Sequence, residues 1–471
     1  MGRKKKTKME LKKTNVKTFD YIIIGSGQAG TPLTFNLAQK GTVALIEKNK
    51  IGGTCLNNGC IPTKTYIASA RRAWDAVHGE EFGIEIPMGT KTNLKKVNER
   101  KNNLINTSRD GIEKSIEDNE NITLFRGEAH FISDYVVSIN GEEISAQNIF
   151  INVGGRALVP NEYKDIPHYT NENILETTIL PEHLVIIGGS YIGLEFGQMF
   201  ARFGSKVTIV ERGNKLISRE DLEVSQVVED IVKKDGVDII FNADEIKASK
   251  NEDNTISVKT NANSTNSVSG THLLLAIGRV PNTDTLQLQN TNIVVSNRGN
   301  IEVDDFCQTN VKGIFALGDC NGKGAFTHTA YNDYQIVENF INGDKKRKIS
   351  DRISTYALFV DPPLGRVGMT KTEAITKGYD VLVGHRPMTK VGRAKEKGET
   401  FGFMEAIIDS KTNLILGACV FGVGGDEIIN GFTNLMYAKQ PYTVFRDGVH
   451  IHPTVSELIP TMLENLKPYK I

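Results

Sequence analysis

The feature that constrains the fold most is a strand–glycine–helix pattern that occurs twice in the chain. The apolar run Phe19–Ile24 precedes the glycine-rich stretch Gly25–Gly30 (GSGQAG), a helix-compatible stretch reaches about Lys40, and Thr42–Glu47 reads as the next strand. Such a unit is typical of a parallel sheet covered by helices. Its glycine turn, at a helix N-terminus, is the usual place where a dinucleotide pyrophosphate binds.

The second copy of the pattern lies near the middle of the chain. His183–Ile187 reads as a strand, Gly188–Gly193 (GGSYIG) as the turn, and Lys206–Glu211 as the following strand. A length of 471 residues allows two to four domains at roughly 100–200 residues each. We therefore expect an α/β fold with two Rossmann-like dinucleotide-binding domains.

The remaining segments have a different character. Alternating runs such as Phe403–Ile408 and Leu414–Ala418 favour antiparallel strands, so a C-terminal α+β domain is expected from about Asp351 onward. Lys91–Asn121 is polar and helix-compatible, and is predicted to be an excursion within the first domain. Asn261–Ser269 is predicted to be a polar loop or hairpin tip.

Charge and cysteine content exclude several classes of protein. The chain has 56 Lys+Arg and 56 Asp+Glu, so no electrostatic reason favours a nucleic-acid or membrane partner. The basic stretch Met1–Lys13 contains no apolar run, so it is expected to be a solvated tail and not a secretory signal. No run is apolar enough to predict a transmembrane helix, and five scattered cysteines do not make a disulfide scaffold. We therefore expect a cytoplasmic protein.

The first glycine motif has the context that a dinucleotide site requires. Gly25 permits the tight turn, Gly27 lets a pyrophosphate approach the backbone, and Gly30 lets helix and strand pack closely. Glu47 ends the second strand, where a carboxylate can accept hydrogen bonds from a ribose diol.

Two cysteines follow this site, at Cys55 and Cys60. Zinc sites prefer duplicated Cys-x-x-Cys pairs, which are absent from this sequence, so no metal site is predicted. With Pro62 near the first position of a helix over Thr63–Arg72, Cys60 would lie at a helix N-terminus, which lowers a thiol pKa. A disulfide closing so short a loop should be reducible, although the spacing also permits a purely structural pair.

The stretch Gly52–Lys64 (GGTCLNNGCIPTK) resembles the redox-active signature of class I FAD-dependent pyridine nucleotide–disulfide oxidoreductases. That family includes dihydrolipoamide dehydrogenase, glutathione reductase and mercuric reductase. The resemblance implies FAD at the first site and NAD(P)H at the second. It also implies that Cys55 is the interchange thiol, that Cys60 lies nearest the flavin, and that Lys64 approaches the flavin and pairs with Glu195.

The second glycine motif departs from the ideal pattern at Ser190, whose side chain could crowd a pyrophosphate. By resemblance, Tyr191 is the tyrosine that covers the flavin and yields to nicotinamide. Glu211 at the end of the following strand favours a free ribose 2′-hydroxyl, and hence NADH. Arg212 and Arg219 leave NADPH as an alternative.

Further cofactor contacts are implied by the resemblance alone. Phe315–Asp319 (FALGD) resembles the second flavin motif, so Asp319 is expected on the ribityl chain. Ala276–Asn282 resembles the segment where the chain returns to the FAD domain. The remaining residues expected at the cofactors are Gly53, Thr54, Gly188, Gly193 and Gly278.

The resemblance also implies the division of the chain. We expect a basic tail at 1–17, an FAD domain at 18–153 and 281–350, an NAD(P) domain at 154–280, and a dimerisation domain at 351–471.

The last candidate site is the string His452–Glu457 (HPTVSE), which matches the family's C-terminal signature. The resemblance makes His452 the acid–base group for the thiols, oriented by Glu457, and a pKa near 6.5 suits histidine to that task. In the family this histidine reaches the cysteine pair of the other subunit, so a homodimer is expected. His450 is a lesser candidate for a supporting role.

The electron acceptor, a small molecule or a metal ion, is the open question. His452 is present and the C-terminal end holds no cysteine pair, which argues against mercuric ion reduction. Gly324–Asp333 and Val391–Ala394 nevertheless resemble the mercuric-reductase-like branch. The alternatives are a reductase of a small disulfide or dihydrolipoamide dehydrogenase, a metal-ion or oxidant reductase, and, more remotely, a flavin-bound redox sensor with little turnover.

Overall fold

The computed structural model describes residues 16–87, 89, 91–261 and 267–470. The expected basic tail, Met1–Lys13, lies outside these residues. Contacts divide the chain into two compact units, and each is assembled from three stretches of sequence. The first unit comprises the chain up to residue 57, with 107–156 and 280–350; the second comprises 58–106, 157–279 and 351–471.

A parallel five-stranded sheet forms the centre of the first unit. Its strand order is β18-β8-β2-β3-β4, and every neighbouring pair is parallel. The strands other than β4 are short, mostly apolar runs that are largely buried, as expected for a sheet with both faces covered, whereas the edge strand β4 is mostly half-buried. The strand bounds are β2 Tyr21–Ile24, β3 Val43–Glu47, β4 Ile122–Arg126, β8 Asn148–Ile151 and β18 Ile314–Ala316.

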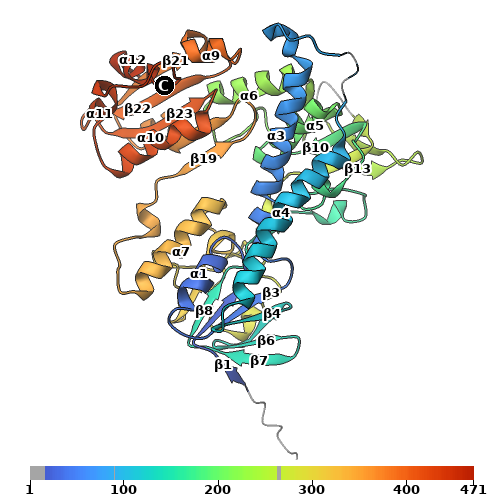
Figure 1. Ribbon diagram of the computed structural model, residues 1–471, viewed down its shortest axis with the longest axis vertical. Helices are drawn as coiled ribbons and strands as arrows, with labels where there is room; N and C mark the ends of the chain where they lie inside the picture. The colour runs from blue at the N-terminus through green and yellow to red at the C-terminus, as the bar shows by residue number, and fades with distance from the viewer. Residues whose placement is uncertain (1–15, 88, 90, 262–266, 471) are drawn as a thin grey trace, which may run out of the picture. The chain divides into compact units, whose positions relative to one another are not determined.

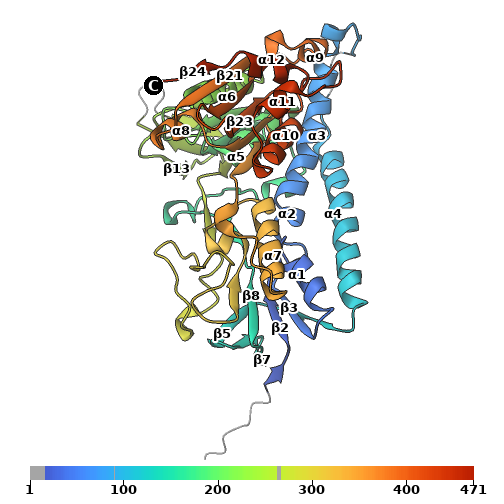
Figure 2. The same ribbon diagram turned by 90° about the vertical axis from the view of Figure 1, so that its left-hand side faces the viewer.

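Two helices of this unit, α1 (Gly30–Leu37) and α7 (Thr327–Ile341), lie side by side next to this sheet (Figures 1 and 2). α1 ends before Lys40, because the amides of Lys40 and Gly41 both donate to the Leu37 carbonyl in a closing turn. A smaller sheet completes the unit, in the order β1-β7-β6-β5. Its bounds are β1 Lys17–Thr18, β5 Ala129–Ser133, β6 Val136–Ile139 and β7 Glu142–Ser145.

The second unit contains the second glycine turn and another parallel sheet, ordered β12-β11-β10-β16. A three-stranded antiparallel sheet follows in the order β13-β14-β15. The polar stretch Asn261–Ser269 joins β14 to β15, and residues 262–266 lie outside the description. The bounds are β10 His183–Ile187, β11 Lys206–Val210, β12 Val237–Ile240, β13 Lys247–Lys250, β14 Ile256–Lys259, β15 Ser267–Gly270 and β16 His272–Leu275.

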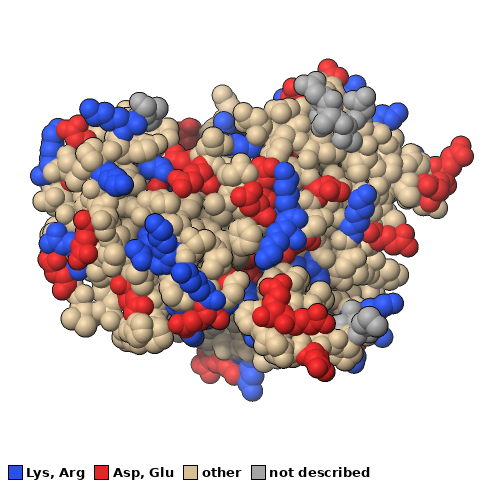
Figure 3. All heavy atoms as spheres, turned by 90° about the horizontal axis from the view of Figure 1, so that it is seen from above, with Lys and Arg blue, Asp and Glu red and all other residues tan. Residues whose placement is uncertain are grey.

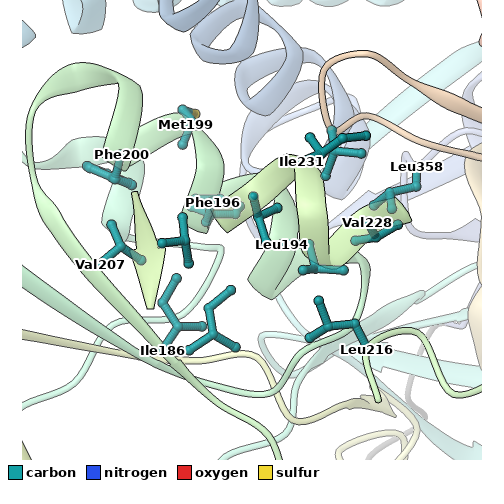
Figure 4. Packing of buried hydrophobic residues seen from close by; sticks show 14 of the residues in the cluster. Ile186, Leu194, Phe196, Met199, Phe200, Val207, Leu216, Val228, Ile231 and Leu358 are labelled. Carbon is teal, nitrogen blue, oxygen red and sulfur yellow. The ribbon is translucent and has the colours of Figure 1, made fainter. Parts of the chain in front are cut away.

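Helices α5 (Tyr191–Phe203) and α6 (Leu222–Lys234) pack against the parallel sheet of this unit. Figure 4 shows the cluster that they form with β10 and β11, in which the Phe196 and Phe200 side chains are 1% and 0% exposed. Helix α4 (Leu94–Glu117) makes up most of the excursion predicted for Lys91–Asn121, and α3 (Cys60–Val77) precedes it in the chain. Strands β9 (Gly155–Ala157) and β17 (Arg279–Pro281) span the sequence positions where the chain passes between the units.

The C-terminal part is built on a six-stranded sheet ordered β19-β20-β23-β22-β21-β24, with antiparallel pairing throughout. Five helices accompany the sheet among the described residues. The strands are β19 Thr355–Leu358, β20 Leu364–Gly368, β21 Val381–Pro387, β22 Phe403–Asp409, β23 Ile415–Phe421 and β24 Lys467–Pro468. The helices are α8 Lys371–Thr376, α9 Gly392–Glu396, α10 Gly425–Tyr437, α11 Thr443–Asp447 and α12 Leu458–Glu464.

The predicted fold class, an α/β fold with two Rossmann-like units and a C-terminal α+β part, is confirmed. Among the described residues, no helix has both the length and the apolar character needed to cross a membrane. Figure 3 shows acidic and basic side chains interspersed over the face in view, in keeping with the zero formal net charge.

The core packing generates a stability prediction. Phe200→Ala should lower the free energy of unfolding by about 3–5 kcal/mol, because it empties a fully buried site. Leu222→Ala is the control, since Leu222 is 70% exposed and its loss should cost less than about 0.5 kcal/mol. Urea unfolding followed by circular dichroism measures both. Equal midpoints for the two variants would contradict the packing described here.

Candidate active site

The first glycine turn connects β2 to α1 and leaves no room for side chains at two of its positions. Gly25 has φ +102°, and a Cβ there would lie 2.4 Å from the Asn152 carbonyl oxygen. A Cβ on Gly30 would lie 2.0 Å from the Gly25 carbonyl oxygen. Gly27 is less crowded, because a Cβ there would approach only Asn152 within 4 Å. The turn therefore offers bare backbone at the start of α1, and such backbone fits a dinucleotide pyrophosphate.

Glu47, at the end of β3, has a carboxylate that is 8% exposed and held by three donors. Its Oε2 accepts from the Ser26 amide (3.0 Å) and the Ser26 hydroxyl (2.7 Å), and its Oε1 accepts from the Asn49 amide (2.8 Å). A carboxylate has about four acceptor positions, so it retains capacity for a ribose hydroxyl. Ser26, which sequence reasoning did not single out, also accepts from the Gly52 amide and ties the cysteine segment to the turn.

The cysteine segment passes directly over the first glycine turn. Gly53 has φ +62°, and a Cβ on it would lie 2.6 Å from Cα of Gly27. A side chain on Gly53 would therefore obstruct this approach, whereas one on Gly27 would meet Asn152 and not Gly53. Thr54 and Cys55 follow within the short helix α2 (Gly53–Asn57), so the structure brings the first cysteine next to the dinucleotide turn.

Cys60 is the first residue of the 18-residue helix α3 and is exposed. The helix begins earlier than expected, at Cys60 and not at Thr63, so Pro62 is its third residue. A proline is tolerated there because the first-turn amides have no intrahelical partner. Free backbone amides and the helix dipole favour negative charge at a helix start, so a thiol in such a position is favoured as a thiolate.

The loop between the two cysteines has a partner that the sequence did not reveal. The buried Asn171 side chain donates from Nδ2 to the Asn58 carbonyl at 3.1 Å. Asn171 belongs to the connection that leads to β10, far from the cysteines in sequence, so no local pattern signals the contact.

The other three cysteines, Cys307, Cys320 and Cys419, are fully buried. Burial raises the pKa of the Cys320 thiol to about 12, and it also raises the pKa of Cys419. A thiol with so high a pKa stays protonated at neutral pH, so Cys320 and Cys419 are not reactive thiolates.

Lys64 and Glu195, which the resemblance predicts to pair, form an ion pair in the structure. Lys64 Nζ lies 2.7 Å from Glu195 Oε2, and the Glu195 side chain is only 8% exposed. Phe359, which sequence reasoning missed, supports both partners. Its amide donates to Glu195 Oε1 at 3.0 Å, and the Lys64 ammonium lies 4.4 Å from its ring centroid.

The second glycine turn, like the first, has two positions at which a side chain would clash with the backbone. A Cβ on Gly188 would lie 2.4 Å from the Ala276 carbonyl oxygen, and one on Gly193 would lie 1.9 Å from the Gly188 carbonyl oxygen. Ser190 is the N-cap of α5, with φ −109° and ψ −168°, so this residue is unstrained and its side chain is exposed. Tyr191 follows as the first residue of α5.

Glu211 lies just past β11 and holds the second turn. Its Oε2 accepts from the Gly189 amide and its Oε1 from the Gly213 amide, both at 2.6 Å. Arg212 is 84% exposed, with its Nε 3.8 Å from Asp244 Oδ1. Gly278, with φ +141°, accepts from the Leu158 amide.

Asp319 lies in the 3₁₀ turn Gly318–Asn321 directly after β18. The glycine turn after β2 is at the same edge of the same sheet, because carboxyl ends of parallel strands share an edge. Gly155, the first residue of β9, is close to Asp319, because an added Cβ on Gly155 would lie 3.5 Å from Asp319 Oδ2. The structure therefore brings Asp319 and the first glycine motif to one edge.

His452 and Glu457 form a hydrogen-bonded pair, with Nδ1 and Oε2 2.8 Å apart. The His452 side chain is 82% exposed, whereas that of Glu457 is 17% exposed. Ile451 and Val449 beside them are also strongly exposed. His450 bonds through Nε2 to the Phe445 carbonyl at 3.1 Å and stacks on the Phe445 ring.

Comparison with known proteins identifies the class. The family model described as pyridine nucleotide-disulphide oxidoreductase matches residues 19–333, and the dimerisation domain of the same family matches residues 354–463. The chain belongs to this family. It is a flavoprotein oxidoreductase that uses FAD and NAD(P)H, and its dimerisation domain supports a homodimer.

Three relatives and one solved structure are similar to the chain over most of their length. The chain is 36% identical to the probable pyridine nucleotide-disulfide oxidoreductase RclA of Escherichia coli (95% of this chain, 99% of that protein). It is 32% identical to dihydrolipoyl dehydrogenase of Geobacillus stearothermophilus (93% and 94%) and 30% identical to mercuric reductase of Staphylococcus aureus (95% and 81%). A solved structure, a Cu(II) complex of the HOCl-induced flavoprotein disulfide reductase RclA from Escherichia coli, matches with a TM-score of 0.87 and 35% identity (95% and 99%).

Thiol burial generates a labelling prediction. In the native, NADH-reduced protein at pH 8, iodoacetamide should modify the Cys55–Cys60 pair and leave Cys307, Cys320 and Cys419 unmodified until the chain is unfolded. The reason is that burial holds the pKa of Cys320 at about 12, so almost no reactive thiolate exists at pH 8. Peptide mass spectrometry locates the labels. Rapid labelling of Cys320 in the native protein would contradict the prediction.

Proposed function

We propose that this protein passes electrons from NADH, by way of FAD, to the Cys55–Cys60 pair and then to an acceptor. The observation that carries the proposal is the passage of the cysteine segment over the first glycine turn, where Gly53 and Gly27 approach each other. In this proposal the FAD domain comprises 18–153 and 281–350, the NAD domain 154–280, and the dimerisation domain 351–471, with a tail at 1–17.

The residues present fit both cofactors. Gly25, Gly27 and Gly30 offer unobstructed backbone to the FAD pyrophosphate, and Gly188 and Gly193 do the same for the nicotinamide nucleotide. Bound FAD and NAD(P)H supply the two-electron chemistry that side chains lack. The remaining contacts proposed for the cofactors come from Glu47, Gly53, Thr54, Asp319, Tyr191, Glu211 and Gly278.

In this proposal the cysteine pair carries out the redox step that the chain's own side chains perform. A disulfide between Cys55 and Cys60 takes up two electrons and one proton, which leaves Cys55 as a thiol and Cys60, at the start of α3, as a thiolate. Lys64, fixed by Glu195 and Phe359, places a positive charge one turn further along the same helix. With a disulfide acceptor, the Cys55 sulfur bonds to one acceptor sulfur and displaces the other. Cys60 then attacks Cys55, which re-forms the Cys55–Cys60 bond and releases the second acceptor sulfur, so two electrons pass to the acceptor.

His452 handles the proton in this scheme. Its Nδ1 is held by Glu457, so the Nε2 nitrogen is the one left to exchange a proton. The exposed ring and its apolar neighbours support a position at the subunit interface, where the histidine serves the partner subunit's cysteine pair.

NADH is the proposed reductant because a carboxylate at this position of the motif, here Glu211, favours a free ribose 2′-hydroxyl and repels a 2′-phosphate. The wild-type protein should prefer NADH over NADPH at least tenfold in kcat/KM, and Glu211→Gln should shrink that preference. Steady-state kinetics with both nucleotides measures it. Asp238→Asn, an exposed change on β12, is the charge-matched control. A wild-type preference for NADPH would overturn the proposed specificity.

Two acceptor classes remain, each supported by a different observation. A dithiol can reduce one disulfide, or two Cu(II) ions by one electron each. The likeness to a chain solved as a Cu(II) complex favours a metal ion as the first acceptor to test. The His452–Glu457 pair favours a disulfide, because a leaving thiolate needs a proton.

His452→Gln separates these acceptors. It should lower turnover of disulfides, including lipoamide, by ~10²–10⁴-fold and leave Cu(II) reduction nearly unchanged, because reducing the metal requires no proton donation to a leaving sulfur. A panel of disulfides, lipoamide, Cu(II) and Hg(II) with NADH makes the measurement, and His168→Gln is the control.

Cys55→Ala tests the scheme as a whole on the same panel. Turnover of every acceptor should be lost. Full activity of this variant with every acceptor would refute the dithiol mechanism, and a purified protein without flavin absorbance would refute the cofactor assignment.

A further inference from the structure

A buried charged cluster in the second unit lies outside the machinery described so far. The Glu220 and Arg366 side chains are 2% and 1% exposed. Glu220 Oε1 accepts from the Tyr356 hydroxyl and, at 3.3 Å, from Arg366 Nε, while Arg366 Nη2 donates to Oε2. A buried carboxylate is stable only when paired and hydrogen-bonded, so these three side chains hold one another in place.

The cluster is assembled from two distant parts of the chain. Tyr356 on β19 and Arg366 on β20 are directly opposed in the antiparallel register, so their side chains lie on the same face. Glu220 comes from the segment between β11 and α6, just before the N-cap Asp221. The position of the Tyr356 phenol is therefore fixed by both the C-terminal sheet and this segment.

Tyr356 in turn contacts Tyr191. The two rings meet edge to face, with centroids 5.6 Å apart and planes at 89°. This is a favoured aromatic geometry, so it stabilises the orientation of the Tyr191 ring that the structure shows. Burial raises the pKa of the Tyr191 hydroxyl to about 12.

The segment that supplies Glu220 also holds the second glycine turn. Glu211 accepts from the Gly189 amide, and the Ile217 amide donates to the Gly189 carbonyl at 3.1 Å. Residues 211–220 therefore bind the second glycine turn through Glu211 and Ile217, and they bind the C-terminal sheet through Glu220. Tyr191 lies two residues after Gly189 in the chain, and its ring contacts Tyr356 of the C-terminal sheet.

We propose that Tyr356, oriented by Glu220 and Arg366, is a positioning residue that sets the orientation of Tyr191 and thereby the affinity for the nicotinamide nucleotide. The inference rests on the proposed role of Tyr191. It assigns to the C-terminal sheet a part in nucleotide binding that is separate from subunit association.

A double-mutant cycle tests the inference in the FAD-loaded protein. Tyr356→Leu removes the ring, Tyr356→Phe removes only the hydroxyl, and each is made with and without Tyr191→Leu. Calorimetry measures the dissociation constant of NAD⁺, and kinetics measures KM for NADH and for the acceptor. Tyr379→Phe, on the exposed side of the same part, is the control.

Tyr356→Leu is expected to change the NAD⁺ dissociation constant and the NADH KM at least threefold, with the acceptor KM unchanged. Tyr356→Phe should act in the same direction and more weakly, and it keeps the test open if the leucine variant does not fold. In the Tyr191→Leu background both effects should vanish.

Effects of Tyr356 variants that add to those of Tyr191→Leu would overturn the inference and leave the proposed function intact. No effect of Tyr356→Leu on nucleotide binding would do the same. If Tyr191→Leu itself changes neither constant, the proposed role of Tyr191 fails, and the inference fails with it.

Discussion

The close approach of Gly53 to Gly27 is the contact on which the proposed chemistry depends. An added methyl group on Gly53 would lie 2.6 Å from the other backbone, so any side chain there pushes the cysteine segment away from the dinucleotide turn. The Glu47–Ser26–Gly52 hydrogen bonds fix the same segment from the side. The cysteine segment and the first glycine turn are therefore brought together by backbone geometry.

Charged side chains of the second unit are kept in place by partners from distant parts of the chain. Lys64 on α3 is paired with Glu195 on α5, and the amide of Phe359 completes the coordination of that carboxylate. A carboxylate this deeply buried would be costly without such donors. The same principle governs Glu220 and Arg366, where burial is nearly complete and pairing is correspondingly tight.

The sequence was most informative where chemistry and local geometry coincide. The two glycine turns and the carboxylates Glu47 and Glu211 could be predicted because each follows a buried strand at a characteristic spacing. The cysteine pair could be predicted from its own motif, Gly52–Lys64. Phe359, Asn171 and Tyr356 could not be found this way, because each acts through contacts with residues more than 100 positions away. The start of α3 was misplaced for a local reason, since a third-position proline is as acceptable to a helix as a first-position one.

The uneven burial of the five cysteines has a consequence for damage. Thiols are the side chains that oxidants attack most readily, and attack follows exposure and thiolate character. Cys307, Cys320 and Cys419 are sealed in apolar cores, whereas Cys60 is open to solvent. An oxidant in solution therefore meets Cys60 first. In the proposed mechanism Cys60 is also one of the two sulfurs that the bound flavin reduces, so the thiol most open to oxidation is one that the enzyme can return to its reduced state.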